Sequence, residues 1–307
     1  MDNKVIVGIG EVLWDCLPEG KKAGGAPANF AYHISQLGYK AYIVSAVGND
    51  SDGDEIVRFF NDKQLNCVFE RTPYPTGTVQ VTLDKHGVPQ YAIQEEVAWD
   101  HLSFNAQLKH LAKEARAVCF GSLAQRSPTT RETIWQFLRA AAANPETLII
   151  FDINLRENFY TKDIIVNSLN ACNILKINDE ELKIVAEMLG YHDVSQDEFC
   201  HQLVLRFQLQ LLILTRGING SRIFTEIMVD SHPIPKVQVA DTVGAGDAFT
   251  AAFTVALLSG KSITVAHDFA VKVSSFVCKQ EGAMNELPPY LRHRLQSTNA
   301  SHGAEKG

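Results

Sequence analysis

The amino-acid sequence predicts an α/β fold in which helices pack against a largely parallel sheet. Three observations lead to this prediction: short β-branched stretches alternate with amphipathic ones, two consecutive helical stretches follow them, and one region alternates apolar and polar residues. Strands separated by helices form parallel sheets, because each crossover returns the chain to the same end of the sheet. The strands predicted for this sheet span residues 4–10, 40–48, 117–123, 147–154, 173–178 and 209–217, with an antiparallel edge strand expected at 221–226.

The predicted helices begin and end at residues suited to those positions. In residues 27–38 the apolar side chains Phe30, Ile34 and Leu37 have helical spacing. Pro27 suits a first helical turn, and Gly38 suits a helix end. The further helices that bear on the argument are expected at 52–65, 244–260 and 263–282.

Residues 77–93 depart from this alternation. Val79, Val81 and Leu83 alternate with polar side chains, and the turn signal "DKHG" follows at 84–87, which is typical of a β-hairpin. With residues 13–22, the hairpin predicts a small sheet outside the main one, formed from about residues 11–23 and 67–100. An accessory sheet of this kind often closes over a substrate as a lid. The alternative is a hairpin with no role in binding.

Length, charge and cysteine content limit the class of protein. The 307-residue chain has a net charge of −7 and no basic cluster, which argues against nucleic acid or an anionic membrane as partner. No apolar stretch is long enough for a membrane span, and the first one is too short for a signal peptide. The six cysteines are scattered without a CxxC pair, which favours free thiols. We therefore expect a cytoplasmic protein with one domain over 1–296 and a disordered tail over 297–307.

Several well-known motifs are incomplete or absent. "SGKS" at 259–262 resembles the end of a P-loop, but Val255 stands where that motif needs Gly, and a helix precedes it. This segment is better interpreted as a link between two helices, in which Gly260 ends the first helix and Ser262 is the N-cap of the next. The absence of GxGxxG and GxSxG argues against dinucleotide binding and a serine hydrolase. The absence of HExxH or another spaced His/Cys set argues against a protein-bound zinc.

The stretch "VADTVGAGDAF" at 239–249 is the strongest chemical signal. A Gly-Ala-Gly loop that opens a helix presents backbone N–H groups and a positive dipole end to an anion. Asp247 alone could be a helix cap. A cap, however, does not need Asp241, three small residues and Asp247 together, whereas phosphoryl transfer needs a base and an anion hole.

Other polar residues follow the predicted strands. In parallel α/β sheets, ligands bind where the carboxyl ends of the strands meet helix N-termini. We therefore expect one edge of the sheet to gather Asp15, Gly24, Gly25, Asn29, Asn154, Arg156, Asn178, Glu181, Thr215, Arg216 and Asp247.

Two separated stretches resemble the signatures of the ribokinase/PfkB family of sugar kinases. The first is "GGAPAN" at 24–29, with Ala31, Gly38 and Gly48 at the family spacing, and the second is Asp241-Thr242 followed by "GAGD" at 244–247. The resemblance covers essentially residues 4–296. "GEVLWDCLP", "TGTVQVTLD", "VAWD" and "DINLR" are most similar to bacterial and plant fructokinases. The resemblance implies a ribokinase-like fold, which is a three-layer α/β/α Rossmann-like domain with a small β-sheet lid.

The resemblance implies catalytic roles for the second signature. Asp247 would be the general base that activates a sugar hydroxyl and would also touch the sugar. The backbone N–H groups of Gly244, Ala245, Gly246 and Asp247 would form the anion hole for the γ-phosphate. Arg156 would add positive charge near the transferred group or the substrate. A salt-bridged surface arginine is the alternative.

It also implies binding roles. Asp15, Gly24, Gly25 and Asn29 would hold sugar hydroxyls. Asn178, Thr215, Gly217 and Gly220 would bind the nucleotide together with Gly244 and Gly246. Glu181, in the N-x-x-E motif, would orient the water shell of Mg²⁺, which suits few carboxylates and several waters.

A monovalent cation site is implied beside the anion hole. Its oxygens would come from Asp241, Val243 and a loop near residues 277–286. Glu286 stands where some relatives have a serine, so the sequence leaves K⁺ dependence open.

The function implied is ATP-dependent transfer of the γ-phosphate to the primary hydroxyl of fructose, giving fructose 6-phosphate. Ribose, 2-keto-3-deoxygluconate or a nucleoside as substrate stays open. A non-catalytic sugar-binding regulatory protein is a further alternative, against which the intact Asp247 and Gly-Ala-Gly loop argue. The expected partners are a sugar and ATP, and a homodimer through the lid strands is a further expectation.

Overall fold

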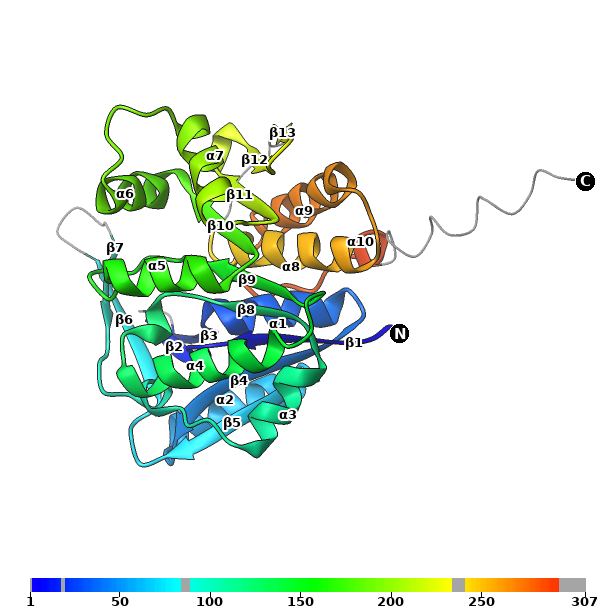
Figure 1. Ribbon diagram of the computed structural model, residues 1–307. Coiled ribbons are helices and arrows are strands. Elements are labelled where there is room, and N and C mark those ends of the chain that lie inside the picture. Colours follow the sequence, from blue (N-terminus) through cyan, green and yellow to red (C-terminus); the bar gives the residue numbers. More distant parts are fainter. Residues whose placement is uncertain (1, 18–19, 84–88, 234–240, 293–307) are drawn as a thin grey trace, which may run out of the picture.

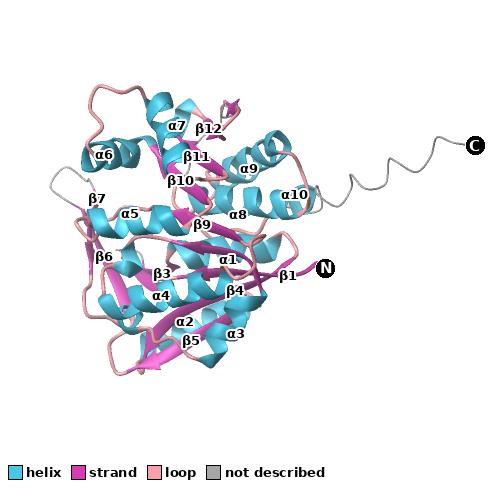
Figure 2. Ribbon diagram, viewed as in Figure 1, coloured by secondary structure: helices cyan, strands magenta, loops and turns pink. Residues whose placement is uncertain are grey.

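The computed structural model describes residues 2–17, 20–83, 89–233 and 241–292. Within them the chain forms a large sheet with helices on both faces and a smaller sheet beside it (Figures 1 and 2). This is the three-layer α/β/α arrangement that the sequence predicts. The predicted turn at 84–87 and the tail at 297–307 lie outside the described residues.

In the described residues the large sheet has nine strands. Their order across the sheet is β13 (Val229–His232), β12 (Ser221–Phe224), β11 (Leu211–Thr215), β10 (Ile174–Asn178), β9 (Leu148–Asp152), β8 (Ala115–Phe120), β1 (Asp2–Ile9), β4 (Tyr39–Gly48) and β5 (Asn66–Thr72). Neighbours from β11 to β5 pair in parallel, and β12 pairs antiparallel with both β11 and β13. The predicted antiparallel strand at 221–226 is therefore present, but the edge position belongs to β13.

Both faces of the sheet are covered because its strands alternate buried side chains between two cores. In β1, Val5, Val7 and Ile9 belong to one core and Ile6 to the other. The first core lies under α3 (Ala106–Glu114), α4 (Pro128–Ala141), α5 (Lys162–Ala171), α6 (Asp179–Leu189) and α7 (Gln196–Arg206). The second lies under α1 (Ala26–Gln36), α2 (Ser51–Asp62), α8 (Ala245–Leu258), α9 (Ile263–Val277) and α10 (Pro289–Arg292).

The smaller sheet is the predicted accessory sheet, and we call it the lid sheet. Its strand order is β3 (Gly20–Gly24), β2 (Leu13–Leu17), β6 (Gly77–Leu83) and β7 (Pro89–Ile93). It is narrower than expected, because residues 66–72 form β5 and pair in parallel with β4 of the large sheet. Residues 98–101 form a 3₁₀ turn, η1 (Ala98–His101), whose Trp99 is buried in the main core.

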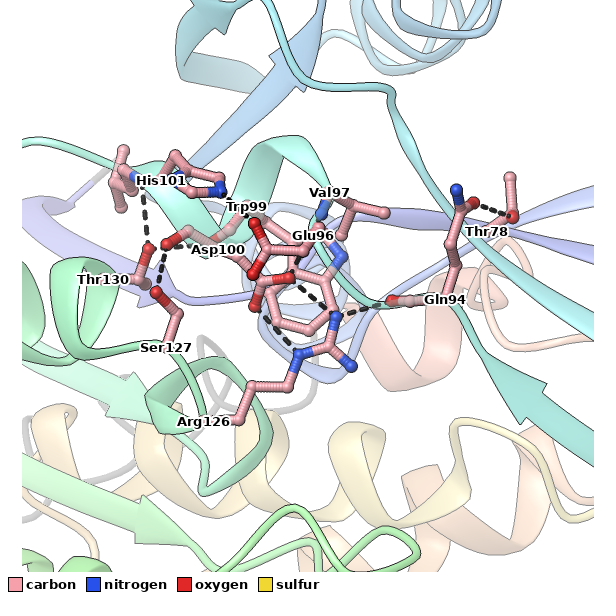
Figure 3. A network of polar contacts seen from close by, with 11 residues as sticks. Thr78, Gln94, Glu96, Val97, Trp99, Asp100, His101, Arg126, Ser127 and Thr130 are labelled. Carbon is pink, nitrogen blue, oxygen red and sulfur yellow. Dashed lines mark hydrogen bonds and ion pairs between the residues drawn. The ribbon is translucent and has the colours of Figure 1, made fainter.

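A buried arginine fastens the lid sheet to the main domain (Figure 3). Arg126 lies just after the 3₁₀ turn η2 (Leu123–Gln125), and its guanidinium pairs with both carboxylate oxygens of Asp100 at 2.9 and 2.8 Å. It also donates to the carbonyl of Gln94, which follows β7, and lies 4.0 Å from the centre of the Trp99 ring. The side chain of Gln94 in turn accepts a hydrogen bond from Thr78 on β6 at 2.8 Å. The described base of the hairpin is therefore fixed to the main domain.

The segment that resembles a P-loop is a connection between helices, as predicted. Gly260 has a left-handed backbone with φ of 73°, directly after α8. The Ser262 hydroxyl accepts a hydrogen bond from the Val265 N–H at the start of α9. These contacts are those of a helix end followed by an N-cap. Among the described residues, no helix is both long enough and apolar enough to cross a bilayer.

Candidate active site

The N-terminus of α8 leaves backbone donors without partners in the helix. The first helical bond runs from the Ala248 N–H to the Gly244 carbonyl at 2.9 Å. The N–H groups of Gly246 and Asp247 therefore have no carbonyl acceptor within α8. Gly244 has φ of 75°, and a Cβ there would lie 2.4 Å from the Ala283 Cβ. The loop thus needs glycine for both its backbone conformation and its packing.

The carboxylate of Asp247 is held by another helix. Asn29, on α1, donates from Nδ2 to Asp247 Oδ2 at 2.8 Å. A helix cap would instead accept from the N–H groups of its own helix. The two residues are 218 positions apart in the sequence, so each family-like signature contributes one member of this pair.

Burial raises the pKa of Asp247 to about 6, and the neighbouring carboxylate of Asp152 adds to this effect. The positive charge of Lys176, the hydrogen bond from Asn29 and the charge of Arg156 act in the opposite direction. A carboxylate with this pKa is mostly ionised at neutral pH, yet binds a proton far better than an exposed one. The arrangement therefore suits general-base chemistry.

A buried ion pair, which the sequence reasoning missed, lies directly beneath the Gly-Ala-Gly loop. Lys176 Nζ, on β10, is 2.9 Å from Asp152 Oδ1, at the end of β9. A Cβ on Gly246 would lie 2.9 Å from the same Nζ, so the ammonium packs against the start of α8. Thr250 connects the two, because its hydroxyl is 3.1 Å from Asp152 Oδ2 and 3.0 Å from the Gly246 carbonyl.

Asp152 begins the family-like stretch "DINLR", but no motif indicates that it pairs with Lys176. The one clue in the sequence is that Lys176 interrupts the apolar stretch "NILKIN". In the structure this lysine is only 8% exposed and lies in a central strand. Such a residue needs a buried counter-ion. The pair therefore only becomes visible when β9 and β10 are placed side by side.

The positive charge of Arg156 influences two of the predicted site carboxylates, Asp15 and Asp247. Burial raises the pKa of Asp15 to about 6, while the charges of Arg156 and Lys22 lower it. Arg156 lowers the pKa of Asp247 as well, so its positive charge acts on both carboxylates. Arg156 donates a hydrogen bond to the Leu155 carbonyl at 3.0 Å, and within the described ranges no acidic side chain forms an ion pair with it. The surface salt bridge considered as the alternative is therefore not seen among the described residues.

The first glycine pair makes room for Asp15 and for the strand before it. A Cβ on Gly24 would lie 2.5 Å from Asp15 Oδ2. A Cβ on Gly25 would lie 2.3 Å from the Glu11 carbonyl, and Gly25 has φ of 114°. Any larger residue at either position would displace the groups that surround the start of α1.

Glu11 is a second residue that the sequence reasoning missed. It is 2% exposed, and its Oε2 has no hydrogen-bond partner. Burial raises its pKa to about 7, against the effect of backbone hydrogen bonds and of Arg156, whereas Asp247 raises it. The signal in the sequence was "GEVLWD", where an acid interrupts an apolar stretch next to Asp15. Glu11 is thus a buried acid whose charge is coupled to those of Arg156 and Asp247.

Asn178 and Glu181 form a capping box at the N-terminus of α6. Asn178 Oδ1 accepts from the Glu181 N–H at 2.8 Å, and Glu181 Oε2 accepts from the Asn178 N–H at 2.9 Å. Glu181 Oε1 accepts from the Leu155 N–H at 3.0 Å, which ties the box to the segment before Arg156. Each carboxylate oxygen of Glu181 therefore keeps a free lone pair.

Thr215 lies beside Asn178, because these residues are partners in the parallel pairing of β10 with β11. The chain then turns through η3 (Gly217–Asn219). Gly217 and Gly220 have positive φ values of 50° and 85°, and a Cβ on Gly220 would lie 2.3 Å from the His232 carbonyl. This turn presents exposed backbone at the same edge of the sheet as Asn178.

Asp241 connects the Gly-Ala-Gly loop to the segment after α9. Its two carboxylate oxygens accept from the N–H groups of Val243 and Gly282, each at 3.0 Å. Val243 is 48% exposed. Glu286 pairs with Arg292. The sequence-predicted oxygens are thus near the loop, with the Asp241 carboxylate already engaged by backbone donors.

Comparisons with known proteins agree with this geometry. Residues 16–289 match the model of the pfkB family carbohydrate kinases. The chain is 27% identical to a fructokinase of Klebsiella pneumoniae over 94% of this chain and 97% of that protein. The structure of an uncharacterized sugar kinase from Pyrococcus horikoshii is 28% identical, with a TM-score of 0.77 over 92% of this chain and 94% of that one. A fructokinase with bound ATP from Xylella fastidiosa is 22% identical, with a TM-score of 0.81 over 97% and 99%.

The chain belongs to the pfkB family of carbohydrate kinases. Its fold is the ribokinase-like one that the two signatures implied. Membership of this family makes it a kinase of the ATP-dependent carbohydrate class.

Proposed function

We propose that this protein is a fructokinase, which transfers the γ-phosphate of ATP to the primary hydroxyl at carbon 6 of fructose. The observation that carries this proposal is the 2.8 Å contact between Asn29 and Asp247, which joins both family signatures at the end of α8. Asp15 and Arg156 complete a polar group suited to a polyol. Fructokinases from a bacterium and from a plant, at 27% and 29% identity, support the choice of sugar.

In this proposal Asp247 accepts the proton of the attacking hydroxyl. Asn29 holds one carboxylate oxygen, which directs the other toward the substrate. The N–H groups of Gly246 and Asp247, with that of Gly244 beside them, stabilise the charge on the transferred phosphoryl group, whereas the Ala245 N–H donates to the Thr242 carbonyl at 3.3 Å. Lys176 lies beneath this loop and adds positive charge without leaving its partner Asp152.

Asp15 and Asn29 would hold sugar hydroxyls, and Gly24 and Gly25 would let the sugar approach the backbone. Arg156 would favour negative charge near these groups. The lid sheet carries Asp15 on β2 and stands beside this edge of the large sheet (Figure 1). It would close over the bound sugar and exclude water.

The nucleotide would lie along Asn178, Thr215, Gly217 and Gly220 and reach Gly244 and Gly246 with its phosphates. Mg²⁺ would accompany it, and the Glu181 carboxylate fits this ion because each oxygen keeps a lone pair for a bound water. Magnesium supplies charge neutralisation of the phosphates when bound.

A monovalent cation such as K⁺ would bind next to the Asp241–Val243 segment. Because both Asp241 carboxylate oxygens already accept backbone hydrogen bonds, backbone carbonyls would supply much of this site.

We further propose that the enzyme acts in the cytoplasm, where ATP is available and thiols stay reduced. The lid sheet ends in β3 and β7, each with one side unpaired within the described residues. Pairing of such edges between two copies would give a homodimer.

The experiment is a substrate panel with ATP and coupled detection of ADP. We expect kcat/KM for fructose to exceed the values for ribose, adenosine, 2-keto-3-deoxygluconate and fructose 6-phosphate by about tenfold or more. A preference for another member of the panel would exclude the fructokinase and leave the kinase. No sugar-dependent release of ADP at all would favour the non-catalytic sugar-binding protein instead.

A further inference from the structure

Three ionisable side chains converge between the sheet edge and α9, outside the candidate active site. Asp230 and His232 come from β13, and His267 comes from α9. One ligand atom from each lies within 4.8 Å of the other two. Asp230 Oδ1 is the common point, at 2.7 Å from His267 Nδ1 and 3.5 Å from His232 Nε2. The side chains of these residues are 10%, 25% and 0% exposed, so the cluster opens to solvent on the His232 side.

Two further residues support the members of this cluster from behind. The Ser221 hydroxyl lies 2.7 Å from His267 Nε2, the ring nitrogen that faces away from Asp230. The Thr264 hydroxyl donates to Asp230 Oδ2 at 2.5 Å. Histidine and carboxylate ligands of metal ions are oriented by such outer contacts on the atoms that do not bind the metal.

Two other interpretations account for less of this arrangement. Ser221, His267 and Asp230 are ordered like the triad of a hydrolase, but Ser221 is 3% exposed, so a substrate cannot reach its hydroxyl. A simple hydrogen-bond chain from Ser221 through His267 to Asp230 explains three residues. It gives no reason for His232 to place its Nε2 toward the same carboxylate oxygen.

We propose that Asp230, His232 and His267 form a binding site for a divalent transition metal of the zinc class. Zinc takes imidazole nitrogen and carboxylate oxygen at about 2.0–2.2 Å, which in a tetrahedral site places neighbouring ligand atoms about 3.3–3.6 Å apart. The separation of 3.5 Å between His232 and Asp230 already has this value, and the 2.7 Å between His267 and Asp230 would open slightly. The solvent side leaves the fourth position to water.

Metal binding requires one change of hydrogen bonding and no change of charge in His267. Without metal, the neutral ring donates from Nδ1 to Asp230 and accepts from Ser221 at Nε2. With metal, the Nδ1 lone pair binds the ion, the proton resides on Nε2, and the Ser221 hydroxyl becomes the acceptor. No oxidant or other reactant is needed.

The site would connect the edge strand β13 of the large sheet to helix α9. Asp230 and His267 are 37 positions apart, which is why no spaced motif reveals the site in the sequence. The sequence-based expectation of no protein-bound zinc rested on such motifs. Because the ion would bind the folded arrangement and not an unfolded chain, it would stabilise the protein.

The test uses the full chain, freed of metal by a chelator that is then removed, and Zn²⁺ as the probe. Binding is measured by equilibrium dialysis with elemental analysis and by melting temperature, with Co²⁺ as a second probe of tetrahedral geometry by visible absorption. We expect one Zn²⁺ per chain and a melting temperature raised by roughly 4 °C at a hundredfold excess over Kd.

His232→Ala should weaken Zn²⁺ binding at least about tenfold, because one of three ligands is lost. The matched control is His110→Ala, since His110 is 76% exposed and pairs with Glu114 on the surface of α3. It should bind Zn²⁺ as the parent does. Asp230→Asn is the second variant, because it keeps the shape of the side chain and removes the charge. The proposal fails if the parent binds no stoichiometric Zn²⁺, or if His232→Ala and Asp230→Asn both bind it as tightly as the parent.

Discussion

Replacing Lys176 by Met tests the charge arrangement beneath α8. Lys176 and Asp152 lie 2.9 Å apart, with side chains 11% and 5% exposed. Removing one partner of a buried pair costs about 3–5 kcal/mol, because the remaining charge has lost its counter-ion. Methionine fills most of the lysine volume, so the loss reports charge and not a cavity. We expect K176M to lose free energy of unfolding of this size, and D152N/K176M to recover most of it.

The same pair of variants predicts a change in pH dependence. Lys176 lowers the pKa of Asp247, and Asp152 raises it. Removing the lysine alone should therefore raise this pKa from about 6 by about one unit. A base must be ionised to accept a proton, so activity is present above its pKa and lost as pH falls through it. The acidic limb of the kcat profile should move to higher pH, so that the loss relative to the parent is about fivefold greater near pH 6 than above pH 8.

The assay is coupled ADP detection with saturating fructose and ATP between about pH 5 and pH 9. D152N/K176M lacks both the charge that raises the pKa of Asp247 and the charge that lowers it. Its acidic limb should therefore return toward that of the parent. An acidic limb for K176M that coincides with the parent would refute the role of Lys176. Equal displacement in both variants would show that a structural change, and not the charge, is responsible.

Three further predictions concern the candidate site. Asp247→Asn keeps the size of the side chain but cannot accept the proton, so kcat should fall by roughly 10²–10⁴-fold with nucleotide affinity retained, and a loss under about threefold would reduce Asp247 to a structural residue. Asp15→Ala removes charge-assisted hydrogen bonds worth about 1.5–3 kcal/mol each, so kcat/KM for fructose should fall by roughly 10–100-fold, whereas an equal loss of ATP affinity would contradict a sugar-specific role. If the lid sheet closes on the sugar, amide hydrogen exchange in β6 and β7 should slow when fructose is added without nucleotide, and unchanged exchange at saturation would remove the lid role.

The periodicity of the sequence was sufficient for the layers of the fold. β1 and β4 are β-branched runs with buried side chains on both faces, and the Pro27 and Gly38 signals mark the limits of α1 correctly within a residue or two. The predicted lid sheet was too wide, because residues 66–72 and 77–83 both have the pattern of a strand and the sequence does not say which sheet each one joins. Only pairing with β4 assigns the first of them to the large sheet.

The candidate site divides in the same way. The sequence by itself predicted the Gly-Ala-Gly loop and Asp247, because they stand together in one short stretch, and the family resemblance added the roles of Asn29, Asn178 and Glu181. Only the tertiary structure decided that Lys176 lies under Gly246, that Glu11 is buried, and that His267 contacts Asp230. Charge interactions and burial depend on distance in space, and these partners lie on separate strands and helices, so no local pattern records them.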